Sequence, residues 1–421
     1  MSKRSLLTTL VDQLFGYLNK LPPETTSYTT TSLRIPITTS SHESLALSAT
    51  LYRPLSLPST RPVIDSVPLL PAVESHFGGE MPWWLRKMLG TNPYSASLSP
   101  EDSNFWKGFD LSTALDRANI PILLTTGWFD PVMPAVLDQY SRLLENNSPA
   151  SLTIGPWTHL GASGRNSLAE VFSWISSHLT NREEKERTAP VRVYITGAEK
   201  WAHLSSWPPS PTHHQELFLS SGSLLAGSVP TTAAPESSST FKFNPLDPTP
   251  AIATPQLFDN TYTKQPNTAL SARPDILTFT SAPLPSDLQI IGRPRVDLFH
   301  TSSSSHFDIL LILNEVDATT SQSYPITEKF IRFSSDNKAP LSLDLHDCAH
   351  MFRKGNYIQL LVGGGSHPRY MRNFGTEEAK ENPAEATMMR SVTHTVSHNA
   401  QAPSRILLPV VTDLDKSKQD V

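Results

Sequence analysis

Apolar and polar residues alternate in two N-terminal stretches, residues 31–37 and 44–52, which a short polar segment separates. Alternation of this kind places every second side chain on one face of a strand, so the two stretches predict a β-hairpin. Before them, apolar residues recur at three- and four-residue spacing up to Leu18 and predict an amphipathic helix that ends at Pro22-Pro23. Its polar face carries little positive charge, so we expect it to pack on the protein rather than on a membrane.

Apolar runs and helical patterns alternate from Asp110 onward. Helices are expected at residues 112–119, 134–144 and 167–179, and buried strands at 120–125, 151–154 and 191–195. Such alternation is typical of a parallel sheet with helices on its faces, the α/β class.

Helical patterns fade after residue 195, and short strand patterns follow one another. They lie at residues 215–219, 287–291, 295–299, 307–313, 330–333, 357–362 and 405–411. Many short strands without intervening helices predict an antiparallel sandwich of jelly-roll type. Residues 221–240 are rich in Ser, Thr and Pro and predict a long surface loop, and the charged tail from Asp413 predicts disorder.

Composition narrows the class of protein. A chain of 421 residues favours two domains, and a net charge of -5 supplies no basic field for a nucleic acid. The 37 prolines indicate a loop-rich chain, and the single cysteine, Cys348, excludes an intrachain disulfide and a Cys-x-x-Cys zinc site. No stretch approaches a membrane span, and Asp12 and Gln13 interrupt the only signal-peptide-like segment. A cytoplasmic protein with neither a membrane nor a nucleic acid as partner is therefore expected.

Two motifs follow the buried strands and carry candidate chemistry. Gly127-Trp-Phe-Asp130 comes after the strand at 120–125, and Gly155-Pro-Trp-Thr-His159 comes after the next. Ligands bind at the carboxyl ends of parallel strands, so Asp130 and His159 are expected at one edge of the sheet. An acid followed by a histidine matches the end of the Ser, Asp, His order of α/β-hydrolases. Alone, Asp130 also suits a helix N-cap, and His159 suits a structural histidine buried against Trp157.

Beyond these motifs, the chain resembles the peptidase S15-like (CocE/NonD) serine hydrolases, the cocaine-esterase and X-prolyl dipeptidyl-peptidase group. Further matching segments are Val191–Gly197, Ser206–Pro209, Asn244–Pro250, Arg273–Thr280, Gly292–Leu298, Phe352–Gly355, Ser366–Arg369 and Pro403–Val410. The resemblance implies a truncated α/β-hydrolase domain followed by a C-terminal jelly-roll β-sandwich. The expected divisions are an N-terminal helix (1–22), a partial hydrolase domain (23–188), the jelly roll (189–411) and a disordered tail (412–421).

One part of the family pattern has no counterpart. Members carry an oxyanion-hole Pro-Tyr and then a Gly-x-Ser-Tyr-x-Gly nucleophile elbow, but here Pro54 leads within a few residues to a segment, from Val63, that resembles the region after the elbow. The sequence contains no Gly-x-Ser-x-Gly, and Gly222-Ser-Leu-Leu-Ala-Gly227 has the wrong spacing. Either a coding segment has been missed or the protein is a shortened form without the usual chemistry.

The resemblance implies an esterase or dipeptidyl peptidase that cleaves an ester or amide acyl group of a small-molecule or peptide substrate. His159 would be the general base, Asp130 would orient it, and Trp128 and Trp157 would line the acyl pocket. The alternative is a catalytically inactive interaction protein built on the jelly roll. No cofactor is expected, and the oligomeric state stays open between a monomer and a homo-oligomer.

No metal is expected either, although histidines occur in pairs. His213-His214 and the pair His394 and His398 lack the convergent carboxylates that a metal site needs. The polar run from Asp344 to His350 predicts a solvated loop between strands.

Overall fold

A computed structural model describes the backbone of residues 28–38 and 44–54 and most of the chain from Leu115 to Thr412. Within the latter stretch the gaps are 117, 119, 164, 181–186, 212, 221–222, 227–236, 256–264, 335–339, 368, 371 and 377–388, and beyond it residues 419–420 are described. The predicted N-terminal helix and most of the predicted helix at 112–119 lie outside the described residues. None of the described helices combines the length and apolar character needed to cross a membrane.

The N-terminal hairpin is confirmed. Strand β1 (Tyr28–Thr38) runs antiparallel to β2 (Ser44–Pro54), with Thr38 opposite Ser44 at the turn end of the ladder. Each strand is longer than its alternating pattern predicted.

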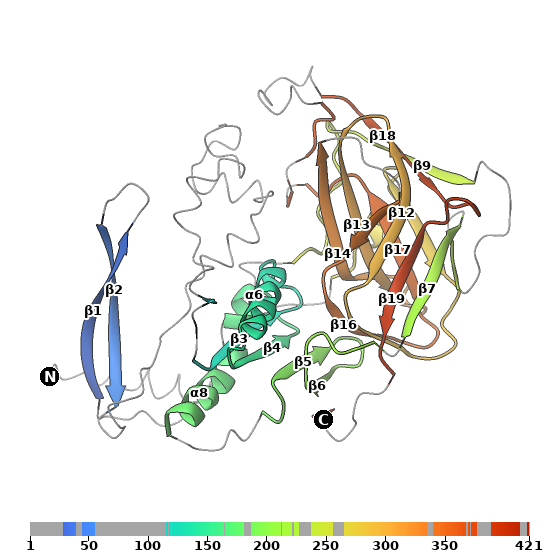
Figure 1. Cartoon of the computed structure of the whole chain (residues 1–421). Helices are drawn as coiled ribbons and strands as arrows, with labels where there is room; N and C mark the ends of the chain where they lie inside the picture. Colours follow the sequence, from blue (N-terminus) through green and yellow to red (C-terminus); the bar gives the residue numbers. More distant parts are fainter. Residues whose placement is uncertain are drawn as a thin grey trace. The chain divides into compact units, whose positions relative to one another are not determined.

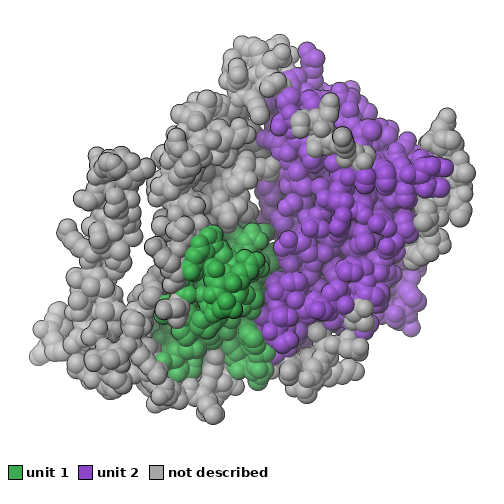
Figure 2. Space-filling view, viewed as in Figure 1, with its two compact units in different colours: residues 1–75, 103–190, 256–261 green, residues 76–102, 191–255, 262–421 purple. Residues whose placement is uncertain are grey.

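The chain divides into two compact units, of residues 1–75, 103–190 and 256–261 and of residues 76–102, 191–255 and 262–421 (Figure 2). The first contains β3 (Ile122–Gly127), α6 (Met133–Glu145), β4 (Ala150–Gly155), α7 (His159–Ser163) and α8 (Arg165–Thr180). Strands β3 and β4 pair in parallel, and α6, which joins them, packs against both (Figure 1). This β-α-β arrangement confirms the α/β class that the alternating pattern predicted.

Helix α6 illustrates how the local sequence builds this unit. Pro134 stands in the first turn, where its missing N–H costs no helical hydrogen bond. The buried side chains recur at helical spacing and face the strands; they are Met133, Ala135, Val136, Leu137, Tyr140 and Leu143. The helix therefore buries one apolar stripe.

Strands dominate the second unit. Strand β5 (Val191–Ile195) forms a hairpin with β6 (Lys200–Leu204), and β20 (Gln419–Asp420) pairs with β6. Thirteen other described strands form one hydrogen-bonded network, in which β8 and β10 form the one parallel pair. The strands of this network are β7 (His213–Ser220), β8 (Ser223–Ala226), β9 (Ser238–Phe243), β10 (Ile276–Ser281), β11 (Leu288–Gly292), β12 (Arg295–Ser302), β13 (His306–Val316), β14 (Ser323–Ser334), β15 (Leu341–Asp344), β16 (Cys348–Phe352), β17 (Tyr357–Gly363), β18 (Val392–Ser397) and β19 (Arg405–Val410).

The core of this unit is visible along β13, which is buried on both faces. Ile309, Leu311 and Leu313 belong to the main hydrophobic cluster. Leu310 and Ile312 point the other way, into a second cluster. A strand that is buried on both faces has a continuous run of apolar residues, which explains why the sequence predicts a strand at 307–313.

Three segments differ from their predictions. Residues 221–240, expected as a loop, contain β8 and the start of β9. The tail contributes β20. The run from Asp344 to His350 is not a solvated loop, because β16 pairs with β11 and buries Cys348 and His350. Strand β8 pairs with the adjacent β7, whereas β9, β16 and β20 pair with segments far away in the sequence, and this pairing overrides the local composition.

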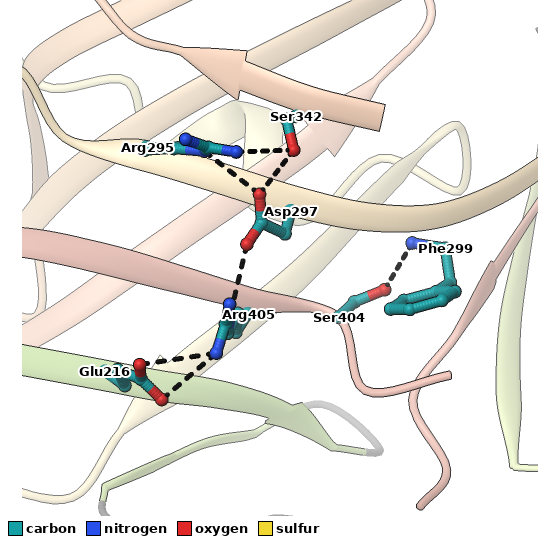
Figure 3. Close-up of polar contacts among 7 residues, drawn as sticks. All are labelled: Glu216, Arg295, Asp297, Phe299, Ser342, Ser404 and Arg405. Carbon is teal, nitrogen blue, oxygen red and sulfur yellow. Dashed lines mark hydrogen bonds and ion pairs between the residues drawn. The ribbon is translucent and has the colours of Figure 1, made fainter. Parts of the chain in front are cut away.

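Charged side chains also connect the strands of this unit. Arg405 on β19 donates to Asp297 on β12 at 3.1 Å and forms an ion pair with Glu216 on β7 at 3.3 Å (Figure 3). Asp297 accepts further hydrogen bonds from Arg295 and Ser342, the latter on β15. Asp297 thus links β12 to β15 and β19, and Arg405 extends the network to β7.

Candidate active site

Asp130 lies just beyond the end of β3 and is almost fully buried, with 3 % of its side chain exposed. Its main-chain N–H donates to the carbonyl of Gly127 at 3.0 Å, which forms a tight turn. Its carboxylate accepts from the main-chain N–H of Val132 at 2.9 Å and from the Thr126 hydroxyl at 3.2 Å, one donor on each oxygen. The N-cap of α6 is Val132 and not Asp130, so the carboxylate is not the cap of that helix.

His159 is the first residue of α7, which begins four residues after the end of β4. The preceding residue, Thr158, starts this short helix: its carbonyl accepts from Ala162 N at 2.9 Å and its hydroxyl from Gly161 N at 3.4 Å. The imidazole is 14 % exposed. His159 therefore stands at the carboxyl edge of β4, as Asp130 does at that of β3.

The structure brings the two side chains together. Nδ1 of His159 lies 3.2 Å from each carboxylate oxygen of Asp130. The parallel register sets this approach, because Gly127 pairs with Gly155 and the chains leave both strands at the same level. Beyond the strands, the two loops remain connected: Trp128 N donates to the Gly155 carbonyl at 2.9 Å, and Phe129 N donates to the Trp157 carbonyl at 3.0 Å.

Asp130 also controls the protonation of the imidazole. Its hydrogen bond raises the pKa of His159 above the ordinary value, and partial burial opposes this shift. A carboxylate at Nδ1 favours the tautomer with the proton on that nitrogen, which leaves Nε2 as the basic nitrogen. A histidine oriented in this way can accept a proton from a hydroxyl and return it to a leaving group.

The two tryptophans predicted to line a pocket are both buried, with 7 % of Trp128 and 9 % of Trp157 exposed. The indole of Trp157 packs directly over the main chain of Gly155. A Cβ atom added to Gly155 would lie 2.3 Å from Cδ2 of that ring. The sequence pattern did not predict this packing or the hydrogen bond from Thr126 to Asp130. The position of Thr126, four residues before Asp130 at the end of a buried strand, is the signal that could have indicated that hydrogen bond.

The remaining histidines form no metal centre in the described part of the chain, where no group of three or more His, Cys, Asp and Glu side chains could hold a metal ion. His213 and His214 are exposed, while His394 and His398 are buried. His394 instead pairs with His300: Nδ1 of the former lies 3.0 Å from Nε2 of the latter.

The sequence matches two family models. The model of the X-Pro dipeptidyl-peptidase C-terminal non-catalytic domain matches residues 183–407, just over half of the chain. The model of the X-Pro dipeptidyl-peptidase (S15 family) matches residues 78–161, a range that includes Asp130 and His159.

Known proteins show the same relationship. A cocaine esterase of Rhodococcus sp. is 23 % identical over 356 residues, which cover 74 % of this chain and 60 % of the esterase. The crystal structure of an α-amino acid ester hydrolase superposes with a TM-score of 0.64 at 24 % identity, covering 78 % of this chain and 61 % of the hydrolase. An aminopeptidase from a Thaumarchaeota archaeon gives a TM-score of 0.64 at 17 % identity, covering 84 % and 65 %. The two structures support the fold, and the chain spans less than two thirds of each of these relatives.

Proposed function

The chain belongs to the X-Pro dipeptidyl-peptidase (S15) and CocE/NonD family of serine hydrolases, and we propose that Asp130 and His159 are the acid and the base of a site that cleaves an ester or amide acyl group. The observation that carries this proposal is the 3.2 Å approach of Nδ1 of His159 to the buried carboxylate of Asp130. The proposed substrate is a small-molecule ester or a peptide, and the proposed location is cytoplasmic.

In the proposed reaction, a serine oxygen bonds to the acyl carbon while Nε2 of His159 accepts the hydroxyl proton. His159 then protonates the departing alkoxide or amine, and an acyl-enzyme remains. Water then hydrolyses the acyl-enzyme: its oxygen bonds to the acyl carbon while His159 accepts a proton from the water. His159 returns this proton to the serine oxygen as the carboxylic acid product leaves. Asp130 keeps the imidazole in the required tautomer and stabilises its charged form. The serine must come from an elbow, which this sequence does not contain.

A fluorophosphonate probe tests these roles. We expect no labelling of the 421-residue chain, because no serine occupies an elbow. We expect labelling when a family member's strand-elbow-helix segment is inserted between Pro54 and Val63, and a loss of roughly a thousandfold or more in its rate on adding His159→Gln. Stoichiometric labelling of the uninserted chain would refute the first expectation. If His159→Gln leaves the labelling rate of the chain with the added elbow segment unchanged, the proposed roles of Asp130 and His159 are refuted.

The alternative is an interaction protein that uses the second unit without chemistry. It is supported by the match of just over half of the chain to a domain described as non-catalytic. If this alternative holds, the natural transcript encodes no elbow, and the 421-residue chain accumulates in cells at its full length. A transcript that encodes the elbow favours the hydrolase.

A further inference from the structure

We propose that Trp157 is a positioning residue, which sets the distance between Asp130 and His159 through its indole ring on Gly155 and its main-chain carbonyl on the opposite loop. This inference rests on the proposed function of the pair. It replaces the expected role of Trp157 as a pocket wall with a role inside the protein.

The first observation is the contact between the indole ring of Trp157 and Gly155. An alanine Cβ at Gly155 would lie 2.3, 2.4 and 2.6 Å from three indole atoms, all far below van der Waals contact. Only a glycine at this position therefore lets the ring approach the main chain so closely at the end of β4. Because Trp157 precedes His159 by two residues, a shift of the ring would be passed along the chain to His159.

The second observation is the link to the other loop. The Trp157 carbonyl accepts the hydrogen bond from Phe129 N, next to Asp130, at 3.0 Å. A Cβ atom at Gly127 would lie only 2.0 Å from this carbonyl oxygen. The two glycines thus allow the acid loop and the base loop to approach one another on either side of Trp157.

The two contacts differ in one useful respect. The obstacle to a side chain at Gly155 is a ring, which a smaller residue can remove. The obstacle at Gly127 is main chain, which no substitution of Trp157 removes. A double-mutant cycle can therefore separate the two contacts.

The experiment measures the protonation constant of His159 in the full chain by NMR titration of ring-labelled histidine, with the resonance assigned by its loss in His159→Gln. We expect the wild-type constant to exceed that of a free imidazole. Gly155→Ala should lower it about tenfold, because the displaced ring moves His159 away from Asp130. In the Trp157→Leu background the same substitution should have no further effect, whereas Gly127→Ala should lower the constant in both backgrounds.

Gly161→Ala is the matched control. It lies in the same helix as His159, and its added Cβ would meet Trp157 Cβ at 3.2 Å, an approach that needs an adjustment of only a few tenths of an ångström, so the constant should fall far less than in Gly155→Ala. If Gly155→Ala fails to fold, Gly155→Ala/Trp157→Leu should fold, and its failure to do so would overturn the proposal.

Two outcomes separate this inference from the proposed function. A raised wild-type constant that Gly155→Ala leaves unchanged, or lowers equally in both backgrounds, overturns the role of Trp157 and leaves the acid–base pair intact. A wild-type constant no higher than that of a free imidazole overturns the pair, and with it the positioning role.

Discussion

The buried pair of His300 and His394 is expected to make the second unit sensitive to mild acid. The two side chains are 4 % and 0 % exposed, and Nε2 of the first lies 3.0 Å from Nδ1 of the second. Phe241 stacks on His394 with a centroid distance of 4.4 Å, and Phe307 contacts both imidazoles. Among the described residues, burial alone shifts the pKa of His300, burial and His300 shift that of His394, and no carboxylate opposes either shift, so a proton taken up here remains uncompensated.

The direction of the effect follows from the shifts. Burial lowers the pKa of His300 from 6.5 to about 4, and burial together with His300 lowers the pKa of His394 to about 3. The unfolded chain therefore binds protons at a higher pH than the folded one. The stability that the neutral pair contributes is present above pH 6.5 and is lost as the pH falls toward 4.

The magnitude comes from the same values. Between pH 7 and pH 5, each histidine becomes almost fully protonated in the unfolded chain and stays neutral in the folded chain, which costs about 2 kcal/mol per residue. The pair together should therefore lower the free energy of unfolding by about 4 kcal/mol over this interval.

Urea titrations at pH 7 and pH 5, followed by circular dichroism, measure this loss. The comparison is with His300→Leu/His394→Phe, which removes both partners, leaves neither unpaired and keeps an aromatic ring on Phe241. His367 and His398, whose pKa values are also lowered, remain in both proteins and cancel. An exposed-site variant, His213→Gln, controls for the loss of a histidine. Equal losses in the wild type and the double variant would refute the reasoning.

Three further outcomes are expected. Residues 189–411 expressed alone should unfold in one cooperative transition by urea titration, and an aggregated or molten fragment would contradict this. Gly197→Ala should lower the free energy of unfolding by about 3 kcal/mol or more, because Gly197 has φ +77 and an added Cβ would lie 2.2 Å from a carbonyl oxygen. Gly355→Ala is the control: its φ is +87 but its Cβ would meet open space, so the loss should be about 1 kcal/mol. Equal losses in urea titrations would contradict this. Arg405→Ala should lower the free energy of unfolding by about 1 kcal/mol, because Asp297 keeps two other partners (Figure 3) and Arg405 is 35 % exposed. Urea titrations at low and high salt measure this loss, and no loss at either salt concentration would contradict the prediction.

The approach of Asp130 to His159 was predictable because it depends on local order. Two buried strand patterns separated by one helix define a β-α-β unit, and parallel strands end at the same edge of a sheet. The structure has these strands as β3 and β4, with bounds within two residues of those predicted. The hydrogen bonds between the two loops were not predictable, since main-chain donors carry no residue-specific signal.

The histidines of the second unit show the opposite case. His300 and His394 are 94 residues apart and meet because β12 and β18 pair, with Ser302 opposite His394. A single sequence does not reveal which strands pair at such a distance. The burial of Asp347 was unpredictable for the same reason, because it also involves a partner far away in the sequence. Nη2 of Arg293, 54 residues earlier, lies 2.7 Å from Oδ2 of Asp347.

Asp130 and His159, the proposed acid and base, lie directly after β3 and β4. The hydrogen bonds described for Asp130 and His159 join residues fewer than 30 positions apart, and the described contacts of Trp157 with Gly127, Gly155 and Phe129 lie within the same segment. These contacts are therefore present in a chain that has no elbow segment. For the proposed roles, an inserted elbow needs to supply the serine hydroxyl and its neighbouring main-chain N–H donors, because Asp130 already lies at hydrogen-bond distance from His159. The labelling experiment can therefore test the roles of Asp130 and His159 by adding one segment to an otherwise unchanged chain.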